Sequence, residues 1–523
     1  MAGGAPSRLG VVGAGTMGAG IAQLGVLAGM ETVLYDAFPE ALQRGRERIE
    51  EGLRKGAERG RWSEDDASAA RARLRTGGEL ADLRDSELVI EAAPERRDLK
   101  RELFGQLAEV CRDEVVIATN TSSILITSLA SAAAGPENVV GMHFFNPPPL
   151  MELVEIIAAE QTGERALEVA TAAAEAMGRR PIRAQDGPGF LVNRCNRPFG
   201  AESLRLLQER IATSEQIDRI VRLGGGFRMG PFELMDLVGI DVGYEVAQSF
   251  NEQSFGEPRW KPSPLQARMV AAGRLGRKTG RGWYDYSGEG RHRAEDPEPR
   301  KPGGGDGRRV AIDGAGALAA ELRDRARAAG FDAREPSDFG GTEEPELVVD
   351  AAVPAPASDL GLAAEGPPLA AVCADRSLAT RGIPEACGFN LLPPLGTTRL
   401  AELARLPGTP DATASEAEEF FTALGFEIEW VEDSPGLVLG RIVCQLINEA
   451  AFAIGEGVGS ADDVDAGLEL GMNHPRGPVA WSRAIGLDHV LATLDGLHAE
   501  RGEERYRAAP LLRRAAYLEA SLG

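Results

Sequence analysis

Short apolar runs alternate with longer mixed segments through the first third of the chain. The runs have the length of buried strands, and they lie at residues 9–12, 31–36, 87–93, 115–119 and 139–145. The segments between them, such as those that begin at residues 19 and 124, have the apolar spacing of helices. Strands that alternate with helices predict an α/β domain with a mostly parallel sheet over residues 1–186.

A helical pattern takes over after Pro188. Apolar side chains recur at helical spacing over residues 190–209, 214–223 and 231–249, and glycines 224–226 form a stop signal. These segments predict an all-α domain over 187–286. The next stretch, 287–308, is polar and rich in Gly and Pro, which is typical of a flexible linker at a domain boundary.

The rest of the chain repeats the first part. At an offset of 247 residues, many glycines, prolines and charged residues recur without an insertion. The pairs include Gly141 and Gly388, Pro147 and Pro394, Glu155 and Glu402, Asp186 and Asp433, Arg194 and Arg441, Glu202 and Glu449, and Gly230 and Gly477. The repeat predicts a second α/β domain over 309–432 and a second all-α domain over 433–523.

Size and charge narrow the function classes. A chain of 523 residues exceeds a single hydrophobic core, which agrees with several domains. The net charge of −23 argues against a nucleic-acid partner and an anionic membrane surface. No apolar run spans a bilayer, and the first residues lack a signal-peptide pattern. Five cysteines without a C-x-x-C pair favour a reducing cytoplasm and show no metal-ligand spacing.

A glycine motif stands between the first predicted strand and the helix that follows. Gly13 permits a tight turn, Gly15 lets the backbone approach a pyrophosphate, and Gly18 allows close packing of helix on strand. A plain turn is the alternative, but Asp36 ends the next strand at the distance expected for a ribose ligand. We therefore expect a Rossmann-type domain that binds NAD rather than NADP, because Asp36 repels a 2′-phosphate. The motif residues are Gly13, Gly15, Thr16, Met17 and Gly18.

Polar side chains emerge at the carboxyl ends of two further strands, at the edge where open parallel sheets bind ligands. Glu91 and Glu95 follow one strand, and Asn120 and Ser122 follow the next. We expect Glu95 and Asn120 to contact the cofactor. Ser122 has two interpretations: it is a ligand at this edge, or it caps the helix that begins near residue 124.

A histidine lies where the apolar run at 139–145 meets a proline-rich turn, and Glu155 follows twelve residues later in a second apolar run. Two neighbouring strands would bring the imidazole of His143 and this carboxylate together. A carboxylate bound to one ring nitrogen fixes the tautomer and raises the basicity of the other, as a proton-abstracting base requires. The alternative interpretation is a histidine of the core.

Residues 40–75 are charged and helical in pattern, with arginines among acidic residues. One interpretation is a solvated helical hairpin. The other is an arm that binds an anionic ligand such as the phosphates of CoA. The arginines are Arg44, Arg46, Arg48, Arg54, Arg59 and Arg61.

Together these motifs resemble the L-3-hydroxyacyl-CoA dehydrogenases, in order over residues 8–286. The resemblance rests on Gly13-x-Gly15-x-Met17-Gly18, Asn120-Thr-Ser122-Ser, His143-Phe-Phe-Asn-Pro, Asp186-Gly-Pro-Gly-Phe-Leu-Val-Asn193-Arg, Gly230-Pro-Phe-Glu-Leu-Met-Asp and Gly276-Arg-Lys278-Thr-Gly-Arg-Gly-Trp-Tyr. It implies an NAD-binding domain followed by a helical domain that binds substrate and forms a dimer interface. The implied roles are a base (His143), its partner (Glu155), two ligands of the reacting oxygen (Ser122 and Asn193) and a ribose ligand (Asp36).

The chain departs from the family pattern in the helical arm. Gly52 and Arg59 stand where the family often has Ser and Lys near CoA, so the contacts to the CoA phosphates stay open.

The second copy has lost residues that carry chemistry in the first. Asn390 takes the place of His143 and is no general base near neutral pH, and Gly440 takes the place of Asn193. Ala319 replaces the third glycine of the motif. We therefore expect a degenerate Rossmann-like domain whose role is structural. In single-copy members of the family two helical domains pack as a dimer, so we expect an intrachain pseudo-dimer here, with or without homo-oligomers. We interpret His474 as a loop residue.

The expected activity is NAD-dependent oxidation of (S)-3-hydroxyacyl-CoA to 3-oxoacyl-CoA. One alternative is a dehydrogenase of the same fold that acts on a free 3-hydroxy acid; another is a non-catalytic binding or structural protein. Double-length chains of this kind resemble 3-hydroxybutyryl-CoA dehydrogenases and the 3-hydroxyadipyl-CoA dehydrogenases of bacterial phenylacetate degradation, and the sequence does not choose between them. We expect no hydratase domain, because the chain opens on the dinucleotide fold.

Overall fold

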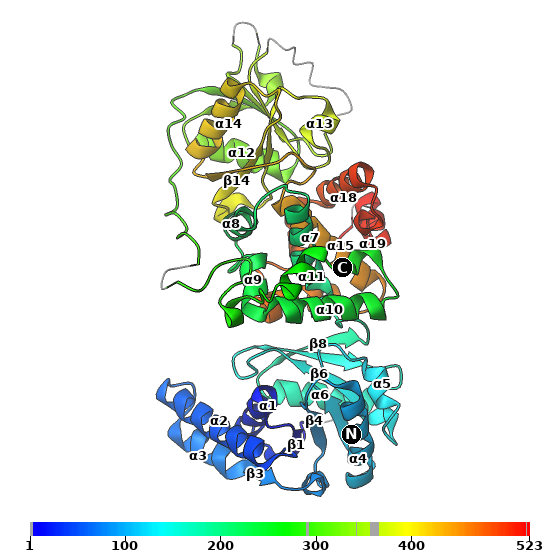
Figure 1. Ribbon diagram of the computed structural model, residues 1–523. Coiled ribbons are helices and arrows are strands. Elements are labelled where there is room, and N and C mark those ends of the chain that lie inside the picture. The colour runs from blue at the N-terminus through cyan, green and yellow to red at the C-terminus, as the bar shows by residue number, and fades with distance from the viewer. Residues whose placement is uncertain (1–3, 289–291, 341–342, 356–365, 519) are drawn as a thin grey trace. The chain divides into compact units, whose positions relative to one another are not determined.

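The computed structural model describes residues 4–288, 292–340, 343–355, 366–518 and 520–523. Residues 289–291 of the expected linker therefore lie outside the described part. The chain divides into two compact units (Figure 1). The first contains residues 1–194 and 457–472, and the second contains residues 195–456 and 473–523. None of the described helices is both long and apolar enough to cross a bilayer.

An eight-stranded sheet forms the centre of the first unit, in the order β3-β2-β1-β4-β5-β6-β7-β8. Neighbouring strands are parallel except β6 and β7, which run antiparallel. All five strands predicted from the apolar runs are present, with ends within two residues of those expected. The strands are β1 (Arg8–Val12), β2 (Glu31–Tyr35), β3 (Leu74–Gly77), β4 (Leu88–Glu91), β5 (Val116–Thr119), β6 (Val139–Phe144), β7 (Leu153–Ala158) and β8 (Arg180–Gln185).

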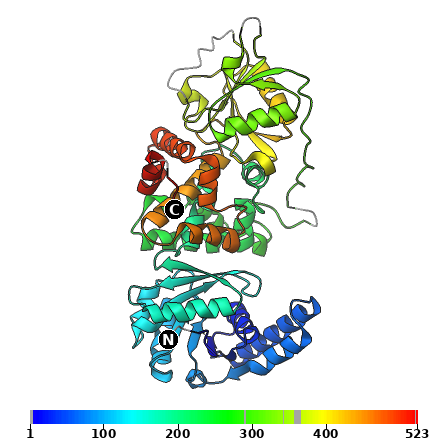
Figure 2. The ribbon, with the colours of Figure 1, turned by 180° about the vertical axis from the view of Figure 1, so that it is seen from behind.

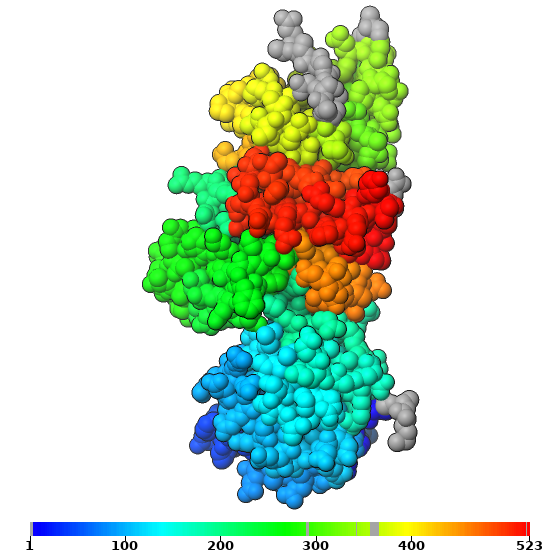
Figure 3. Space-filling view, turned by 90° about the vertical axis from the view of Figure 1, so that its right-hand side faces the viewer, coloured from blue at the N-terminus to red at the C-terminus, as the bar shows by residue number. Residues whose placement is uncertain are grey.

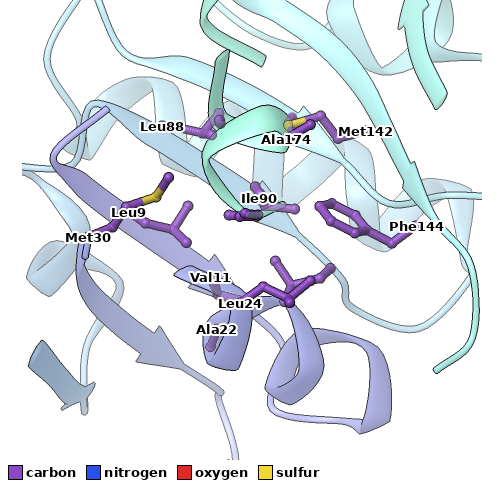
Figure 4. Packing of buried hydrophobic residues seen from close by; sticks show 14 of the residues in the cluster. Leu9, Val11, Ala22, Leu24, Met30, Leu88, Ile90, Met142, Phe144 and Ala174 are labelled. Carbon is purple, nitrogen blue, oxygen red and sulfur yellow. The ribbon is translucent and has the colours of Figure 1, made fainter. Parts of the chain in front are cut away.

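Apolar residues of these strands pack against the helices that cover the sheet. Figure 4 shows Val11, Ile90 and Phe144 from three strands directed toward Leu24 of α1, all in one buried cluster. Figure 2 shows α6 lying across a face of the sheet. The alternation of strand and helix thus gives the predicted α/β fold. The helices are α1 (Thr16–Leu27), α4 (Arg97–Val110), α5 (Ile126–Ala130) and α6 (Glu164–Ala176).

The charged segment after β2 forms a helical hairpin, α2 (Pro39–Glu58) and α3 (Glu64–Arg73), which stands out from the sheet (Figure 1). The turn between the two helices folds back on α2 through Trp62, whose ring covers Gly56 so closely that a Cβ there would lie 1.8 Å from a ring carbon. The Trp62 indole N–H donates to the Leu53 carbonyl at 2.9 Å. A helical hairpin is therefore present over residues 40–75, and it agrees with both interpretations of the segment.

The helical segment after β8 departs from the prediction at two backbone positions. Helix α7 begins at Val192 rather than at residue 190, because Gly189 and Phe190 have φ angles of 71° and 51° that no right-handed helix accepts. The single helix expected at 231–249 is two helices, broken at Gly239 with φ 107°. The helices are α7 (Val192–Gln208), α8 (Ser214–Gly225), α9 (Pro231–Val238), α10 (Ile240–Gln253) and α11 (Pro264–Ala271).

A second sheet of seven strands lies in the second unit, in the order β10-β9-β11-β12-β13-β14-β15. This is the order of β2-β1-β4-β5-β6-β7-β8 in the first sheet, and β13 and β14 are again the antiparallel pair. No described strand corresponds to β3. Figure 2 shows α12 across this sheet. The elements are β9 (Arg309–Asp313), α12 (Ala317–Ala328), β10 (Asp332–Arg334), β11 (Leu347–Asp350), β12 (Leu369–Val372), α13 (Leu378–Arg381), β13 (Cys387–Asn390), β14 (Leu400–Ala404), α14 (Asp411–Ala423) and β15 (Glu427–Val431).

The last helices of the chain include α18 and α19, whose surface is red in Figure 3. In the second unit α15 packs against α8 of the first helical segment. His474 lies in the loop before α17, as predicted, but it is buried and contacts the Asn196 amide oxygen through Nε2 at 2.9 Å. Burial lowers the pKa of His474 to about 3, so the ring is neutral. The helices are α15 (Leu439–Gly455), α16 (Ala461–Ala466), the π-helical turn η7 (Gly467–Gly471), α17 (Pro478–Ile485), α18 (Leu487–Arg501) and α19 (Pro510–Tyr517).

A buried ion pair joins the two copies of the helical segment within the second unit. Arg441 of α15 is fully buried and binds Glu202 of α7 at 2.5 Å and Glu209 at 2.8 Å. The Tyr506 hydroxyl also donates to Glu202, at 3.0 Å. Removal of one partner from such a pair leaves an uncompensated buried charge, so these residues fix how the two helical segments pack.

Candidate active site

The glycine loop between β1 and α1 has the geometry that a dinucleotide needs. Gly13 has φ 100°, and its N–H donates to the Tyr35 carbonyl at 2.8 Å. A Cβ at Gly18 would lie 1.8 Å from the Gly13 carbonyl oxygen, so only glycine fits there. A Cβ at Gly15, by contrast, would have no atom within 4 Å. The amino end of α1 is therefore open to a pyrophosphate, and the loop fits NAD.

The predicted ribose ligand is held beside this loop. The Asp36 carboxylate accepts the Ala14 N–H at 2.8 Å through one oxygen and the Phe38 N–H at 3.0 Å through the other. The side chain is only half-buried, so it faces the space in front of the loop with lone pairs to spare. Thr16 is exposed and Met17 is half-buried at the start of α1.

The antiparallel pairing of β6 with β7 brings His143 and Glu155 together as directly opposed residues. Nδ1 of the imidazole lies 2.6 Å from a carboxylate oxygen of Glu155. Both side chains are buried, and the imidazole ring packs 4.7 Å from the Phe145 ring and 5.9 Å from the Phe190 ring. Since an ionised carboxylate only accepts, Nδ1 carries the proton and Nε2 is the acceptor in the neutral ring. The cross-strand pair expected from the sequence is thus present.

The second oxygen of Glu155 stabilises the start of α7. It accepts the Leu191 N–H at 3.1 Å and the Val192 N–H at 2.9 Å. A carboxylate at this position satisfies free amides and complements the positive end of the helix. Asn193 is the next residue of α7 and is half-buried. Glu155 therefore connects the imidazole to the helix that carries Asn193.

The residues at the end of β5 are fixed by two side-chain acceptors. Glu95 accepts the Ser122 N–H at 3.1 Å and the Ser123 hydroxyl at 2.9 Å, while the side chain of Ser122 stays exposed. The Asn120 amide oxygen accepts the Phe144 N–H at 2.8 Å, next to His143. Burial raises the pKa of Glu95, but the Lys100 charge and these hydrogen bonds outweigh burial and hold its pKa below the usual value.

A buried lysine supports this edge, and the sequence interpretation missed it. Lys100 of α4 is 1% exposed and binds the two Glu91 carboxylate oxygens at 2.7 Å and 3.0 Å, and Glu95 at 3.4 Å. The signal was in the sequence: Lys100 shares the helical face of Phe104 and Leu107, which are both buried. A lone lysine on an apolar helix face needs a buried partner, and Glu91 supplies it.

The alternative role of Ser122 as a helix cap is wrong. The two amides that open α5, those of Ile126 and Thr127, donate to the Asp186 carboxylate at 3.1 Å and 2.8 Å. Asp433 does the same for α13 in the second copy, with the amides of Leu378 and Ala379. This shared capping role accounts for the pairing of Asp186 with Asp433 in the repeat.

Hydrogen bonds therefore tie together the segments that carry the predicted site residues. Glu155 binds Val192, which precedes Asn193, and Asn120 binds Phe144, which follows His143. Among the described residues, no hydrogen bond joins Ser122 or Asn193 directly to the imidazole. The arrangement leaves Nε2 of His143 as the nitrogen that can take a proton from a ligand.

The second copy repeats the same framework without the base. Asn390 Nδ2 donates to Glu402 at 2.8 Å, and Glu402 accepts the Val438 N–H at 2.7 Å and the Leu439 N–H at 3.1 Å. A Cβ at Gly440 would lie only 3.3 Å from the Asn390 amide. The glutamate thus caps a helix in both copies, and only the first copy adds an imidazole.

The stability of the second copy is expected to depend on pH through Glu402. Burial raises the pKa of this carboxyl to about 7 from 4.5, although hydrogen bonds from Asn390 and two amides oppose burial. The folded state then holds a proton that the unfolded state releases. The stabilisation that this proton gives to the folded state is fully present below about pH 4.5 and is lost as the pH rises to about 7. The free energy of unfolding then falls by an amount on the order of 3 kcal/mol. Thermal unfolding of the wild type and Glu402→Gln at pH 5 and pH 8 measures it. An equal slope in both proteins contradicts the assignment.

Comparison with known families agrees with this geometry. The model of the 3-hydroxyacyl-CoA dehydrogenase NAD binding domain matches residues 8–187, and the model of the C-terminal domain matches residues 189–286 and again 436–520. The chain belongs to the 3-hydroxyacyl-CoA dehydrogenase family. It is an NAD-dependent oxidoreductase, and its helical domain occurs twice.

Some members of the family match nearly the whole chain, and others match about half of it. The chain is 34% identical to the 3-hydroxyadipyl-CoA dehydrogenase of Escherichia coli over 510 residues. This match covers 98% of this chain and 97% of the relative. A probable 3-hydroxybutyryl-CoA dehydrogenase of Deinococcus radiodurans is 40% identical over 279 residues, 53% of this chain and all of the relative. The crystal structure of an Escherichia coli 3-hydroxybutyryl-CoA dehydrogenase matches with a TM-score of 0.83 at 33% identity, over 98% of this chain and 99% of that one.

Proposed function

We propose that the protein oxidises (S)-3-hydroxyacyl-CoA to 3-oxoacyl-CoA, and catalyses the reverse reaction, with His143 as the base. The observation that carries the proposal is the buried bond between His143 Nδ1 and Glu155 at 2.6 Å, at the edge of the sheet that also carries the glycine loop. A carboxylate-oriented imidazole has a free ring nitrogen that can accept a proton, whereas the Asn390 amide in the same framework has none.

The residues of the first copy divide the work of the reaction. The glycine loop and Asp36 would hold NAD, which would supply the acceptor for the hydride that leaves C3. Nε2 of His143 takes the hydroxyl proton, and Glu155 stabilises the imidazolium that forms. The exposed Ser122 hydroxyl and the Asn193 amide hold the substrate oxygen as it becomes a carbonyl. Two backbone amides fix Glu155, so the carboxylate does not have to reorganise during proton transfer.

A cavity of about 270 Å³ beside the helical arm favours a CoA thioester over a free acid. Its walls bring basic side chains of α2 and the α2–α3 turn together with Trp62 and with Pro147, Pro149 and Leu150, which closely follow His143 in sequence. Phosphates bind guanidinium groups well, and an aromatic ring suits a purine. The basic residues are Arg48, Lys55, Arg59 and Arg61. One acidic residue, Glu51, also lines the cavity and pairs with Lys55 at 2.7 Å, so the three arginines supply its net positive charge.

The double variant Arg59→Gln, Arg61→Gln tests this assignment. We expect KM for an acyl-CoA substrate to rise about tenfold with kcat nearly unchanged, because each exposed charge pair is worth up to about 1 kcal/mol. Steady-state kinetics with the CoA ester and with its N-acetylcysteamine analogue, which lacks the nucleotide, measures the effect. KM for the analogue should be the same in the wild type and in the variant.

Arg54→Gln is the matched control for that experiment. Arg54 lies on α2, one turn before the α2–α3 turn that carries Arg59 and Arg61, and pairs with Glu58 at the surface, outside the cavity wall. Its loss should leave both substrates unaffected. A rise in KM that is equal for Arg54→Gln and the double variant, or equal for both substrates, would contradict a specific CoA site and favour a free 3-hydroxy acid.

The proposed substrate class is the one that the similar proteins share. Similar proteins are named for 3-hydroxyadipyl-CoA and for 3-hydroxybutyryl-CoA. We extend to this chain the shared feature, a 3-hydroxyacyl group on CoA, and leave the length of the acyl group and a terminal carboxylate to a substrate panel.

We further propose that the second copy is a catalytically inactive partner that forms a pseudo-dimer within one chain. Its support is the buried ion pair of Arg441 with Glu202, and a second pair in which Arg259 binds Glu449 at 2.7 Å. Truncation after residue 286 should expose these buried faces and give an aggregated or self-associated protein. Sedimentation velocity measures this, and a monomeric fragment with full activity would contradict the proposal.

A further inference from the structure

A segment of the second copy belongs to the first unit of the fold. Residues 457–472 contain α16 and the π-helical turn η7, and they pack against β8 and β7 of the NAD-binding domain. The Gln185 N–H donates to the Val458 carbonyl at 2.8 Å and anchors the beginning of the segment. In Figure 3 this region of the chain is orange.

Three glycines of this segment lie close against side chains of the first copy. A Cβ at Gly459 would lie 2.6 Å from a Leu191 methyl carbon, and a Cβ at Gly467 would lie 2.7 Å from a Val192 methyl carbon. At Gly471 a Cβ would lie 3.3 Å from the Phe145 ring and 2.9 Å from a methyl carbon of Leu153. Larger residues do not fit at these positions without a shift of the side chains opposite.

The residues on the other side of these contacts are the ones that hold the His143–Glu155 pair. The Phe145 ring packs 4.7 Å from the imidazole. The amides of Leu191 and Val192 both donate to the Glu155 carboxylate. The segment 457–472 therefore contacts the base and its carboxylate partner through one residue in between.

The repeat supplies the counterpart of this interaction in the second unit. There the Glu432 N–H donates to the Ile211 carbonyl at 2.9 Å, as Gln185 does to Val458, and both residues of the pair are related by the offset of 247. A Cβ at Gly225 of α8 would lie 2.9 Å from Leu439, whose amide binds Glu402. Each copy thus packs a helical segment against the site framework of the other.

The two segments differ in how closely they approach. By the offset of 247, Gly459 and Gly467 occupy the positions of Ala212 and Ile220 in the first copy. Helix α8 runs without interruption to Gly225, whereas its counterpart changes to a π-helical turn at Gly467. π-Helical turns are rare in proteins, and those that occur lie frequently at functional sites. The smaller side chains lie on the segment that faces the copy with the histidine.

We infer that segment 457–472 is a positioning element for the catalytic base, supplied by the inactive copy within the same chain. It fixes the plane of the imidazole through Phe145, and it fixes the Glu155 carboxylate through Leu191 and Val192. The second copy therefore has a role in catalysis without a reacting group of its own. This inference rests on the proposed function of His143 as the base.

The double variant Gly467→Ala, Gly471→Ala tests the inference against the matched variant Gly224→Ala, Gly225→Ala. Each adds two methyl groups to a helical segment, the first opposite Val192 and Phe145 and the second opposite Leu439. We expect the first to lower kcat about tenfold with KM within about threefold, because shifts below 1 Å misalign a base. The second should retain kcat. Thermal unfolding checks that both fold; if a double variant does not, Gly471→Ala and Gly224→Ala replace the pair.

A readout without turnover separates this inference from the proposed function. The proton on Nδ1 of His143, bonded to Glu155, should give a low-field resonance in the proton NMR spectrum that His143→Asn removes. Gly467→Ala, Gly471→Ala should shift or broaden this signal, and Gly224→Ala, Gly225→Ala should not. Equal kcat and an unshifted signal in the two double variants would overturn the inference. Absence of wild-type activity with every acyl-CoA would instead contradict the proposed function.

Discussion

Replacing His143 by asparagine is expected to lower kcat by a factor on the order of 10²–10⁴, the range that a general base contributes. The fold should survive, because the second copy already holds Asn390 in the equivalent position, bonded to Glu402 at 2.8 Å. The variant therefore converts the first framework to the second and removes the proton acceptor alone. Steady-state kinetics with saturating NAD and an acyl-CoA substrate measures the loss.

His498→Asn is the control for that variant, because His498 lies exposed on α18. It should keep wild-type kcat, and both variants should show wild-type unfolding temperatures within a few degrees. Turnover by His143→Asn within a factor of a few of the wild type would remove His143 from the mechanism.

The second large effect is expected from Glu155→Gln, which should lower kcat on the order of 10²-fold or more. The carboxylate accepts hydrogen bonds from the imidazole and from the amides of Leu191 and Val192. In glutamine one carboxylate oxygen becomes an NH2 group, which cannot accept, so at least one of these N–H groups loses its partner. The tautomer of the imidazole is then no longer fixed, and the imidazolium loses its counter-charge.

Glu402→Gln makes this test specific to catalysis. Glu402 accepts from Asn390 and from two helix amides in the same way, so the replacement perturbs an equivalent helix cap. It should leave kcat within about twofold of the wild type. If Glu402→Gln and Glu155→Gln lose activity equally, Glu155 serves only the fold, as its counterpart does.

The fold could be predicted where local patterns determine it. Apolar runs of four to seven residues gave strands with ends within two residues of the observed ones, because a buried parallel strand needs a continuous apolar stretch. The opposed positions of His143 and Glu155 followed from two such runs joined by a short turn. The glycine motif likewise defines its own backbone, as φ 100° at Gly13 shows.

The remaining features depend on contacts between distant residues, which local patterns do not contain. Asp186 caps a helix that begins sixty residues earlier, so the sequence offered the nearer Ser122 instead. Lys100 depends on a carboxylate of another element. The placement of 457–472 with the first unit depends on packing between two copies, and a repeat in sequence shows which residues correspond without showing which copy each one contacts.

We propose that the first copy is a working 3-hydroxyacyl-CoA site. The most direct test of this proposal follows the reduction of NAD at 340 nm. The substrates are (S)-3-hydroxybutyryl-CoA, (S)-3-hydroxyadipyl-CoA and the corresponding free 3-hydroxy acids. We predict turnover of at least one CoA ester, with kcat/KM at least about 10²-fold above that of its free acid, and loss of that turnover in His143→Asn. Equal or higher kcat/KM for the free acids, or no turnover of any CoA ester, would contradict the account.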